Sequence, residues 1–195
     1  MIPLLHDFTD TTVLVFGGGS VGARKARRFT READVIVVSP AFADTDFGGA
    51  ERVRAAPDTD DVTDWVADAD PALVVAATDD DELNGAIERA ARDAGALVNR
   101  TDEHGERDSG SVVVPATVRD GPVTVAISTG GTSPALSRYL RQRIEDDIDG
   151  AGEMARLTGE LRAELQADAV DPERRRNAVR AVVRSARVWK HLDSG

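Results

Sequence analysis

A glycine-rich loop directly after a short apolar run is the feature that most constrains the fold of this chain. Residues Thr12–Phe16 read TVLVF, a continuous apolar run typical of a strand buried on both faces of a sheet. The next six residues, Gly17–Gly22, read GGGSVG and fit the pattern G-x-G-x-x-G. A helix is predicted to begin within this loop, because Val21, Ala26 and Phe29 fall on one helical face. The sequence therefore predicts a strand–loop–helix unit near the start of the chain.

This loop has the pattern of a site for dinucleotide phosphates. In such a loop the first glycine allows a tight turn, the second lets the backbone approach a pyrophosphate, and the third lets helix and strand pack closely. The N-terminus of the helix then faces the phosphates with its partial positive charge. We expect the dinucleotide to contact Gly17, Gly19, Ser20, Val21 and Gly22. The alternative is a glycine-rich turn that holds no ligand.

The acid that completes this motif in many NAD sites is missing. Such an acid follows the second strand, about 20 residues after the loop, and holds the adenosine ribose. Here the expected second strand, residues 35–38, is followed by Ser39-Pro40-Ala41-Phe42. We expect Ser39 to hydrogen-bond the ribose, and Ala41 or Phe42 to pack on the adenine. Thr78, after a later strand, is expected to line the nicotinamide side. This feature alone leaves NAD and NADP both open.

Strands and helices are expected to alternate through about residue 100. Further strands are predicted around Val53 and over residues 73–77 and 97–99, with helices over 62–67 and 80–94. This alternation predicts βαβ units and a parallel sheet. The acids Asp79–Asp81 are expected first of all to cap the second of these helices.

The pattern changes in the second half of the chain. Two β-rich runs, Ser111–Arg119 and Pro122–Ser128, flank the turn signal Asp120-Gly121 and predict a hairpin. Ser133 and Pro134 predict a helix start, and that helix is expected to end near Asp147. A break at 150–152 and helices over 154–168 and from 172 onward are predicted next. The fold expected is α/β: a Rossmann-like parallel sheet (1–110), a β-hairpin region with its helix (111–147) and a C-terminal helical domain (148–195).

Composition excludes several classes of function. The formal net charge is −11, with 35 acidic and 24 basic residues, so we expect neither nucleic acid nor an anionic membrane as partner. The absence of Cys and the presence of only three His exclude a disulfide framework and a thiolate metal site, so no metal ligands are assigned. No apolar run reaches membrane-spanning length and no basic leader precedes one, so a cytoplasmic location is expected. Acid-rich composition with only two lysines, Lys25 and Lys190, favours a halophilic protein.

Four segments together resemble one enzyme family. They are GGGSVGARKA (17–26), AATDDDELN (76–84), NRTD (99–102) and VAISTGGTSPALSRYLRQRIE (125–145), which occur in that order at the ends of expected strands. This ordered series resembles the precorrin-2 dehydrogenase family, NAD-dependent enzymes that make sirohydrochlorin; some members also insert Fe²⁺ to give sirohaem. The resemblance covers most of residues 1–147, and the helical tail is similar to the family's C-terminal domain.

The resemblance implies a homodimer with residues 111–147 as its β-hairpin dimerisation region, a tetrapyrrole substrate and a catalytic acid. The family's N-x-x-D acid matches Asp102, expected at the carboxyl end of the fifth strand, where ligands of parallel sheets bind. The loop that follows looks about three residues longer than in the family, which leaves Asp108 as a rival. His104 lies in the same loop, although a lone exposed histidine is usually inert. Whether this chain inserts iron stays open, because no dedicated metal ligands are present.

The polar loop 128–133, STGGTS, is the expected substrate site. Precorrin-2 carries eight carboxylates, and backbone N–H groups and hydroxyls before a helix bind anions. We expect Ser128, Thr129 and Gly130 to contact the substrate and Arg138 to pair with a carboxylate. The alternative is simple helix capping. Two other functions are also open: an NAD-sensing regulatory domain without catalysis, and an oxidoreductase acting on another anionic substrate.

Overall fold

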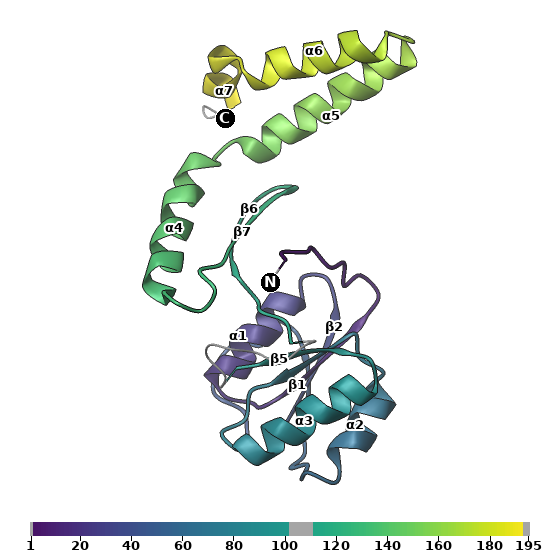
Figure 1. The fold of residues 1–195 in the computed structure, drawn as a ribbon, viewed down its shortest axis with the longest axis vertical. Helices are drawn as coiled ribbons and strands as arrows, with labels where there is room; N and C mark the ends of the chain where they lie inside the picture. The colour runs from purple at the N-terminus through teal and green to yellow at the C-terminus, as the bar shows by residue number, and fades with distance from the viewer. Residues whose placement is uncertain (1, 102–110, 193–195) are drawn as a thin grey trace. The chain divides into compact units, whose positions relative to one another are not determined.

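The chain is described by a computed structural model over residues 2–101 and 111–192 (Figure 1). It divides into two compact units, Met1–Val114 and Pro115–Gly195. The three domain boundaries expected from the sequence stay predictions.

The first unit is built on a five-stranded parallel sheet with the strand order β3-β2-β1-β4-β5. Its strands are β1 (Thr12–Phe16), β2 (Asp34–Ser39), β3 (Glu51–Arg54), β4 (Leu73–Ala76) and β5 (Leu97–Arg100). The central strands are apolar runs because helices cover both of their faces. The order places β2 and β4 on either side of β1, so the loops that follow these three strands meet at one edge of the sheet.

Three helices cover the two faces of this sheet (Figure 1). Helix α1 (Ser20–Phe29) packs on one face, and α2 (Val62–Ala69) and α3 (Asp81–Asp93) pack together on the other. Side chains of β1 alternate between them: Val13 and Val15 join the cluster with α1, and Leu14 and Phe16 join the cluster with α2 and α3. The doubly covered parallel sheet confirms the fold class predicted from the sequence.

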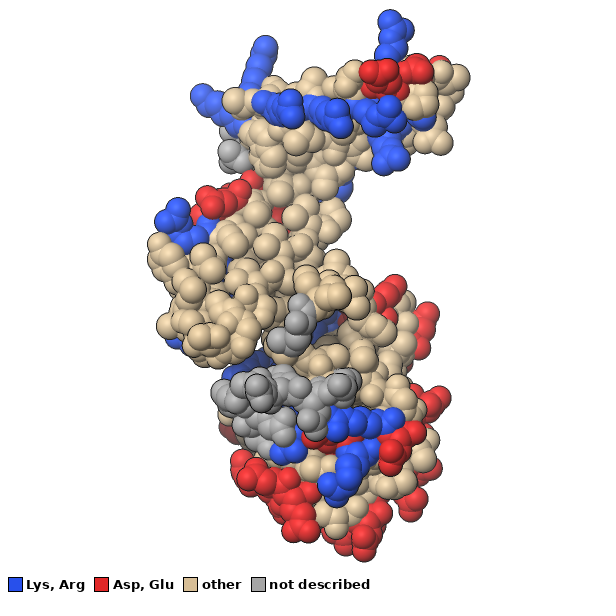
Figure 2. All heavy atoms as spheres, viewed as in Figure 1, with Lys and Arg blue, Asp and Glu red and all other residues tan. Residues whose placement is uncertain are grey.

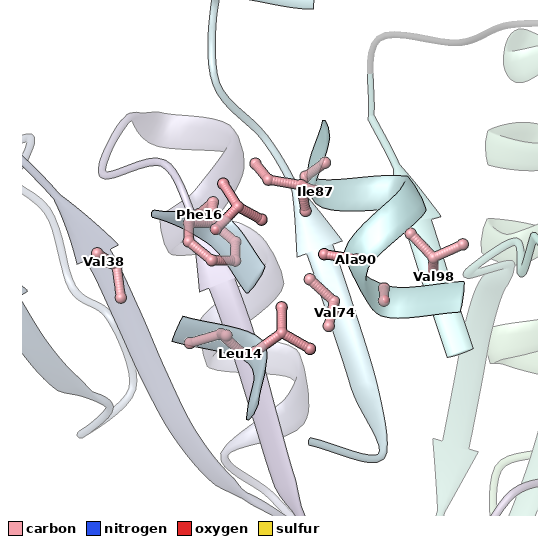
Figure 3. Packing of buried hydrophobic residues seen from close by; sticks show 11 residues of the cluster. Leu14, Phe16, Val38, Val74, Ile87, Ala90 and Val98 are labelled. Carbon is pink, nitrogen blue, oxygen red and sulfur yellow. The ribbon is translucent and has the colours of Figure 1, made fainter. Parts of the chain in front are cut away.

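Figure 3 shows the packing beneath α3, where Leu14, Phe16 and Val74 of the strands lie against Ile87 and Ala90 of the helix. Burial of each larger side chain contributes about 1.5–3 kcal/mol relative to exposure. The result is a rigid sheet whose carboxyl edge presents the loops after β1, β2 and β4.

The strand predicted over 111–119 is wrong at its beginning. Strand β6 spans Ala116–Asp120, and Ser111 instead forms a parallel bridge with Val98 of β5. The Val112 N–H donates to the Val98 carbonyl oxygen at 2.8 Å, and Val112 and Val114 pack beside the α1 cluster. Pro115, which has no N–H to donate, separates this extension from the hairpin.

The second unit is a hairpin followed by helices. Strand β7 (Val123–Ile127) pairs with β6 antiparallel, and the helices are α4 (Pro134–Asp147), α5 (Ala151–Ala167), α6 (Pro172–Val183) and α7 (Ala186–Leu192). The predicted break at 150–152 is only partly correct. Gly150 caps α5 in a left-handed conformation, but Gly152 lies inside the helix, where its N–H donates to Asp120 Oδ2 at 2.8 Å. Nothing larger than glycine fits there, because an added Cβ would stand 2.8 Å from the Asp120 carbonyl oxygen.

Over residues 2–101 and 111–192, none of the helices has both the length and the apolar character needed to cross a membrane.

Candidate functional site

The glycine loop between β1 and α1 is fixed by close backbone contacts. Gly17 has φ +116°, and a Cβ there would lie 2.2 Å from the Ala77 carbonyl oxygen. A Cβ on Gly22 would lie 1.9 Å from the Gly17 carbonyl oxygen. The Gly17 N–H also donates to the Val38 carbonyl oxygen at 3.0 Å. The loop is therefore held at once by the ends of β2 and β4, as a pyrophosphate site at this edge requires.

The same loop leaves space where a ligand would approach. An added Cβ on Gly19 meets no atom within 4 Å, in contrast to Gly17 and Gly22. Gly19 is also the N-cap of α1, and as a glycine it has no side chain to accept a hydrogen bond from the first turn of that helix. The first turn holds no acid and includes Ser20, Val21 and Gly22. Backbone donors beside an open glycine fit a dinucleotide pyrophosphate, so the residues present suit the predicted cofactor.

The end of β2 lies directly against the loop. A Cβ on Gly18 would stand 2.2 Å from the Ala41 carbonyl oxygen and 2.8 Å from Ser39 Oγ. Ser39 is buried, and its hydroxyl donates to the Ala41 carbonyl oxygen at 2.8 Å. Toward a ribose hydroxyl, Ser39 Oγ can therefore act only as a hydrogen-bond acceptor. Ala41 is exposed, whereas Phe42 is partly buried in an edge-on contact with Phe47, 5.7 Å between ring centres. The structure brings all three predicted adenosine-side residues next to the glycine loop.

Thr78 follows β4 on the other side of the loop. A Cβ on Gly17 would lie 3.2 Å from the Thr78 nitrogen, so the two segments touch. The Thr78 hydroxyl is held internally, because it donates to Oδ1 of the fully buried Asn84 at 2.7 Å. Asn84 also accepts from the Thr78 N–H and donates back to the Thr78 carbonyl oxygen, at 3.2 and 3.0 Å. Thr78 therefore borders the predicted nicotinamide side in a rigid conformation.

A lysine and an asparagine meet at the end of β5. Lys25 Nζ of α1 donates to Oδ1 of Asn99 at 2.7 Å, and Asn99 Nδ2 donates to the Val112 carbonyl oxygen at 2.7 Å. Asn99 is buried. This pair places an ammonium group beside the strand that leads to Asp102. Asp102 itself and its rivals Asp108 and His104 lie outside the described residues.

The last residue of β5 is anchored to α3 by charge. Arg100 pairs with the buried Glu88 at 3.2 Å, and Arg92 pairs with the same carboxylate at 2.5 Å. Buried charges of this kind are retained only when paired. The network fixes the position where β5 ends, two residues before Asp102.

The loop predicted to bind substrate belongs to the second unit, and several of its polar side chains form hydrogen bonds within the loop or to the start of α4. The Thr129 hydroxyl donates to the Ser133 carbonyl oxygen at 3.0 Å, and Ser133 Oγ accepts from the Leu136 N–H at 3.3 Å as the cap of α4. Ser128 is exposed, and its Oγ accepts from the Gly130 N–H at 3.2 Å. Arg138 is exposed one turn into α4. Ser128, Gly130 and Arg138 are thus accessible to an anion, and Thr129 mainly shapes the loop.

Several contacts of the site were not predicted from the sequence. One indication of the Asn84 hydrogen bonds was present in the sequence: Asn84 is a polar residue on the same face of α3 as the apolar Ile87 and Ala91. The pair Lys25–Asn99 spans 74 positions and gave no local signal. Among the described residues no group of three or more His, Asp or Glu side chains gathers as metal ligands would.

Known proteins resemble this chain over nearly its whole length. A family described as putative NAD(P)-binding matches residues 4–116, and one described as sirohaem biosynthesis protein central matches 120–147. A precorrin-2 dehydrogenase of Methanosarcina barkeri is 34% identical over 96% of this chain and 85% of its own length. A siroheme synthase of Stutzerimonas stutzeri is 34% identical over 90% of this chain, which spans only 37% of that protein.

A solved structure shares the fold. The structure titled SirC, precorrin-2 dehydrogenase, superposes with a TM-score of 0.73 at 22% identity, covering 98% of this chain and 96% of its own. The similarity in sequence, together with the glycine loop and the motifs after β4, β5 and β7, leads to one conclusion. The chain belongs to the precorrin-2 dehydrogenase family.

Proposed function

We propose that this chain catalyses the oxidation of precorrin-2 to sirohydrochlorin with NAD as hydride acceptor, a step of sirohaem synthesis. One observation carries the proposal: a glycine loop open at Gly19, in a chain 34% identical to a precorrin-2 dehydrogenase over 96% of its length. A non-catalytic NAD sensor is not favoured, because such a domain has no need of the 128–133 loop before α4.

When it is bound, NAD accepts the hydride, and the chain's own residues hold the cofactor and accept the proton. Backbone N–H groups at the start of α1 hold the pyrophosphate, and Ser39, Ala41 and Phe42 hold the adenosine end. Oxidation of the macrocycle removes a hydride and a proton together. A carboxylate after β5 accepts that proton, and the Lys25 ammonium is held by Asn99 of that strand at 2.7 Å.

We assign the proton-accepting role to Asp102, with Asp108 as the rival that the longer loop leaves open. Asp102→Asn is expected to lower kcat for precorrin-2 oxidation by about 10²–10⁴-fold, the usual contribution of a positioned acid–base group. Asp108→Asn serves as the matched control and is expected to stay within about twofold of the parent. NAD binding, measured by calorimetry, should be unchanged in both variants. A large loss in Asp108→Asn alone would reverse the assignment.

The carboxylates of the substrate bind at Ser128, Thr129, Gly130 and Arg138. Gly131 is exposed with a left-handed backbone and presents its N–H there, and Arg138 adds a charged donor, whereas the Gly130 N–H donates to Ser128 Oγ. The side chains that cap α4 position the loop rather than contact substrate.

The chain acts as a homodimer through the second unit. Among the described residues of this unit, the buried apolar side chains are only Val118, Ile127 and Met154. Helix α4 has no buried residue, and its large apolar side chains Leu136 and Tyr139 are 46% and 53% exposed. Apolar area left open in this way is typical of a face that a second copy covers.

The dimer is tested by Tyr139→Glu, with Tyr139→Phe as the control. Light scattering after size exclusion should give twice the chain mass for the parent and the Phe variant, and a smaller mass for the Glu variant. A parent protein that stays monomeric at micromolar concentration would contradict the dimer.

Two further assignments rest on the family and on composition. Fe²⁺ is proposed as a second substrate, which the macrocycle's own nitrogens would bind, so the lyase step is tested by adding Fe²⁺ after oxidation is complete.

The acid-rich, lysine-poor composition supports a halophilic source. The cytoplasmic location stays a prediction.

A further inference from the structure

Two arginines lie where the adenosine ribose is expected, and the segment 39–43 that follows β2 contains no acid. Arg54 is the last residue of β3, and the strand register pairs it with Ser39, the last residue of β2. Arg52 lies on the same side of β3, two positions earlier. In nucleotide sites of this fold an acid at the end of the second strand holds the 2′-hydroxyl of NAD, whereas a nearby arginine accommodates the 2′-phosphate of NADP.

A chain of contacts connects the Arg54 side chain to the pyrophosphate loop. Arg54 Nη1 donates to the Pro40 carbonyl oxygen at 3.2 Å. Pro40 lies between Ser39 and Ala41, the two residues that an added Cβ on Gly18 would strike. The guanidinium is therefore held at the segment that touches the glycine loop, within reach of the ribose of a nucleotide bound there.

Both guanidinium groups are oriented by an aromatic ring. The Cζ atoms of Arg52 and Arg54 lie 5.7 and 6.0 Å from the centre of the Phe42 ring, the distance of a cation–π contact. Arg52 also lies 5.6 Å from the Phe47 ring centre. Such contacts reduce the freedom of two long side chains before any ligand binds, which lowers the cost of ordering them.

The two cations are also available to an anion. Both residues are exposed, and within residues 2–101 and 111–192 no carboxylate forms an ion pair with either. The first acids after Ser39 are Asp44 and Asp46. Asp46 Oδ1 accepts from the Gly48 N–H at 2.8 Å and is engaged in its own turn.

We propose that Arg54, supported by Arg52, binds the 2′-phosphate of NADP, so that this site accepts NADP as well as NAD. The inference rests on the nucleotide site of the proposed function and adds a specificity-determining residue to it. A phosphate monoester carries nearly two negative charges, and a guanidinium can donate to two of its oxygens at once. Ser39 lacks the negative charge with which an acid at that position would repel the phosphate.

The test uses the full chain and two probes without a nicotinamide, ADP-ribose and 2′-phospho-ADP-ribose. Calorimetry in buffer of fixed ionic strength should give the 2′-phosphorylated probe an affinity equal to or higher than that of ADP-ribose. Arg54→Ala should weaken the phosphorylated probe by about tenfold or more while changing ADP-ribose by less than about twofold. Arg31→Ala, which removes the same charge beside the opposite edge of the sheet, should change neither.

Two results would overturn the inference. The first is a parent protein that binds ADP-ribose at least about tenfold more tightly than its 2′-phosphorylated form. The second is equal weakening of both probes in Arg54→Ala, which would indicate a structural role. If Asp44 instead holds the ribose hydroxyls, the parent should prefer ADP-ribose, and Asp44→Asn should lose ADP-ribose binding. Failure of either probe to bind the parent at all would instead count against the proposed nucleotide site itself, and so against the proposed function.

Discussion

Two glycines of one loop, Gly19 and Gly22, differ in what a side chain would meet. A Cβ on Gly22 would collide with the Gly17 carbonyl oxygen at 1.9 Å, whereas a Cβ on Gly19 would enter open space. Gly22 is therefore required by the fold of the protein alone. Gly19 is required only if a ligand comes close to the backbone, so the two positions separate structure from function.

This difference gives a prediction at the scale of single residues. Gly22→Ala should destabilise the protein by about 1–3 kcal/mol, the usual result of forcing atoms into a packed site. Gly19→Ala should leave the midpoint of thermal unfolding unchanged within error but raise the Kd for NAD by about tenfold or more. Thermal unfolding and NAD calorimetry on both variants are the measurement. Undiminished NAD affinity in Gly19→Ala would show that the pyrophosphate does not approach this backbone.

Residue-level contacts were the least predictable part of the site. The glycine loop was predictable because its pattern is local: a Cβ on Gly17 or Gly22 would meet backbone atoms, whereas one on Gly19 would meet no atom within 4 Å. The hydrogen bond from Lys25 to Asn99 was not, because the partners are 74 positions apart. The approach of Arg54 to Pro40 depends on the register of β2 and β3, which propensity alone does not fix.

Helices and strands were more predictable, because each depends on local pattern and local capping. The strand Thr12–Phe16 and the helix from Pro134 to Asp147 form as the sequence predicts. The error at residues 111–115 has a tertiary cause: an apolar run with high strand propensity extends beside β5 instead of joining the hairpin. Gly152 was expected to break a helix, but the carboxylate of Asp120 accepts its N–H from within α5.

At the scale of elements, the first turn of α3 tests the reading of Asp79–Asp81 as capping residues. Asp80 is the N-cap, and its Oδ1 accepts from the N–H groups of Glu82 and Leu83 at 2.9 and 3.0 Å. Asp80→Ala should lower the free energy of unfolding by about 0.5–2 kcal/mol, because two helix donors lose their acceptor. Asp79→Ala, at the exposed position before it, should have an effect below about 0.5 kcal/mol. Equal losses in the two variants, measured in urea, would contradict the capping role.

For the whole molecule, the distribution of charge is the dominant feature. Figure 2 shows acidic side chains over much of the first unit and a row of basic side chains along α6. The arginines on or directly after that helix are Arg174, Arg175, Arg176, Arg180 and Arg184. The net charge of −11 adds self-repulsion that opposes the compact state. Salt that shortens the screening length to about 3 Å at 1 M should relieve this repulsion.

The corresponding prediction concerns stability as a function of salt. Raising KCl from about 0.1 to about 2 M should raise the midpoint of thermal unfolding by about 5 °C or more, since 1 kcal/mol corresponds to about 2–4 °C at this size. Differential scanning calorimetry at fixed pH measures it. Tetramethylammonium chloride at the same ionic strength controls for ion-specific effects. A midpoint that falls or stays constant with salt would contradict the halophilic assignment.

The most direct test of the proposed function is an anaerobic assay of the purified chain with precorrin-2 and NAD in about 2 M KCl, a concentration chosen to screen its charge. Sirohydrochlorin and NADH absorbance are followed in the same cuvette. We predict that both appear together in equal amounts, and that neither appears when NAD is omitted. Unchanged precorrin-2, with NAD binding shown separately by calorimetry, would contradict the dehydrogenase and indicate a nucleotide-binding domain without this activity.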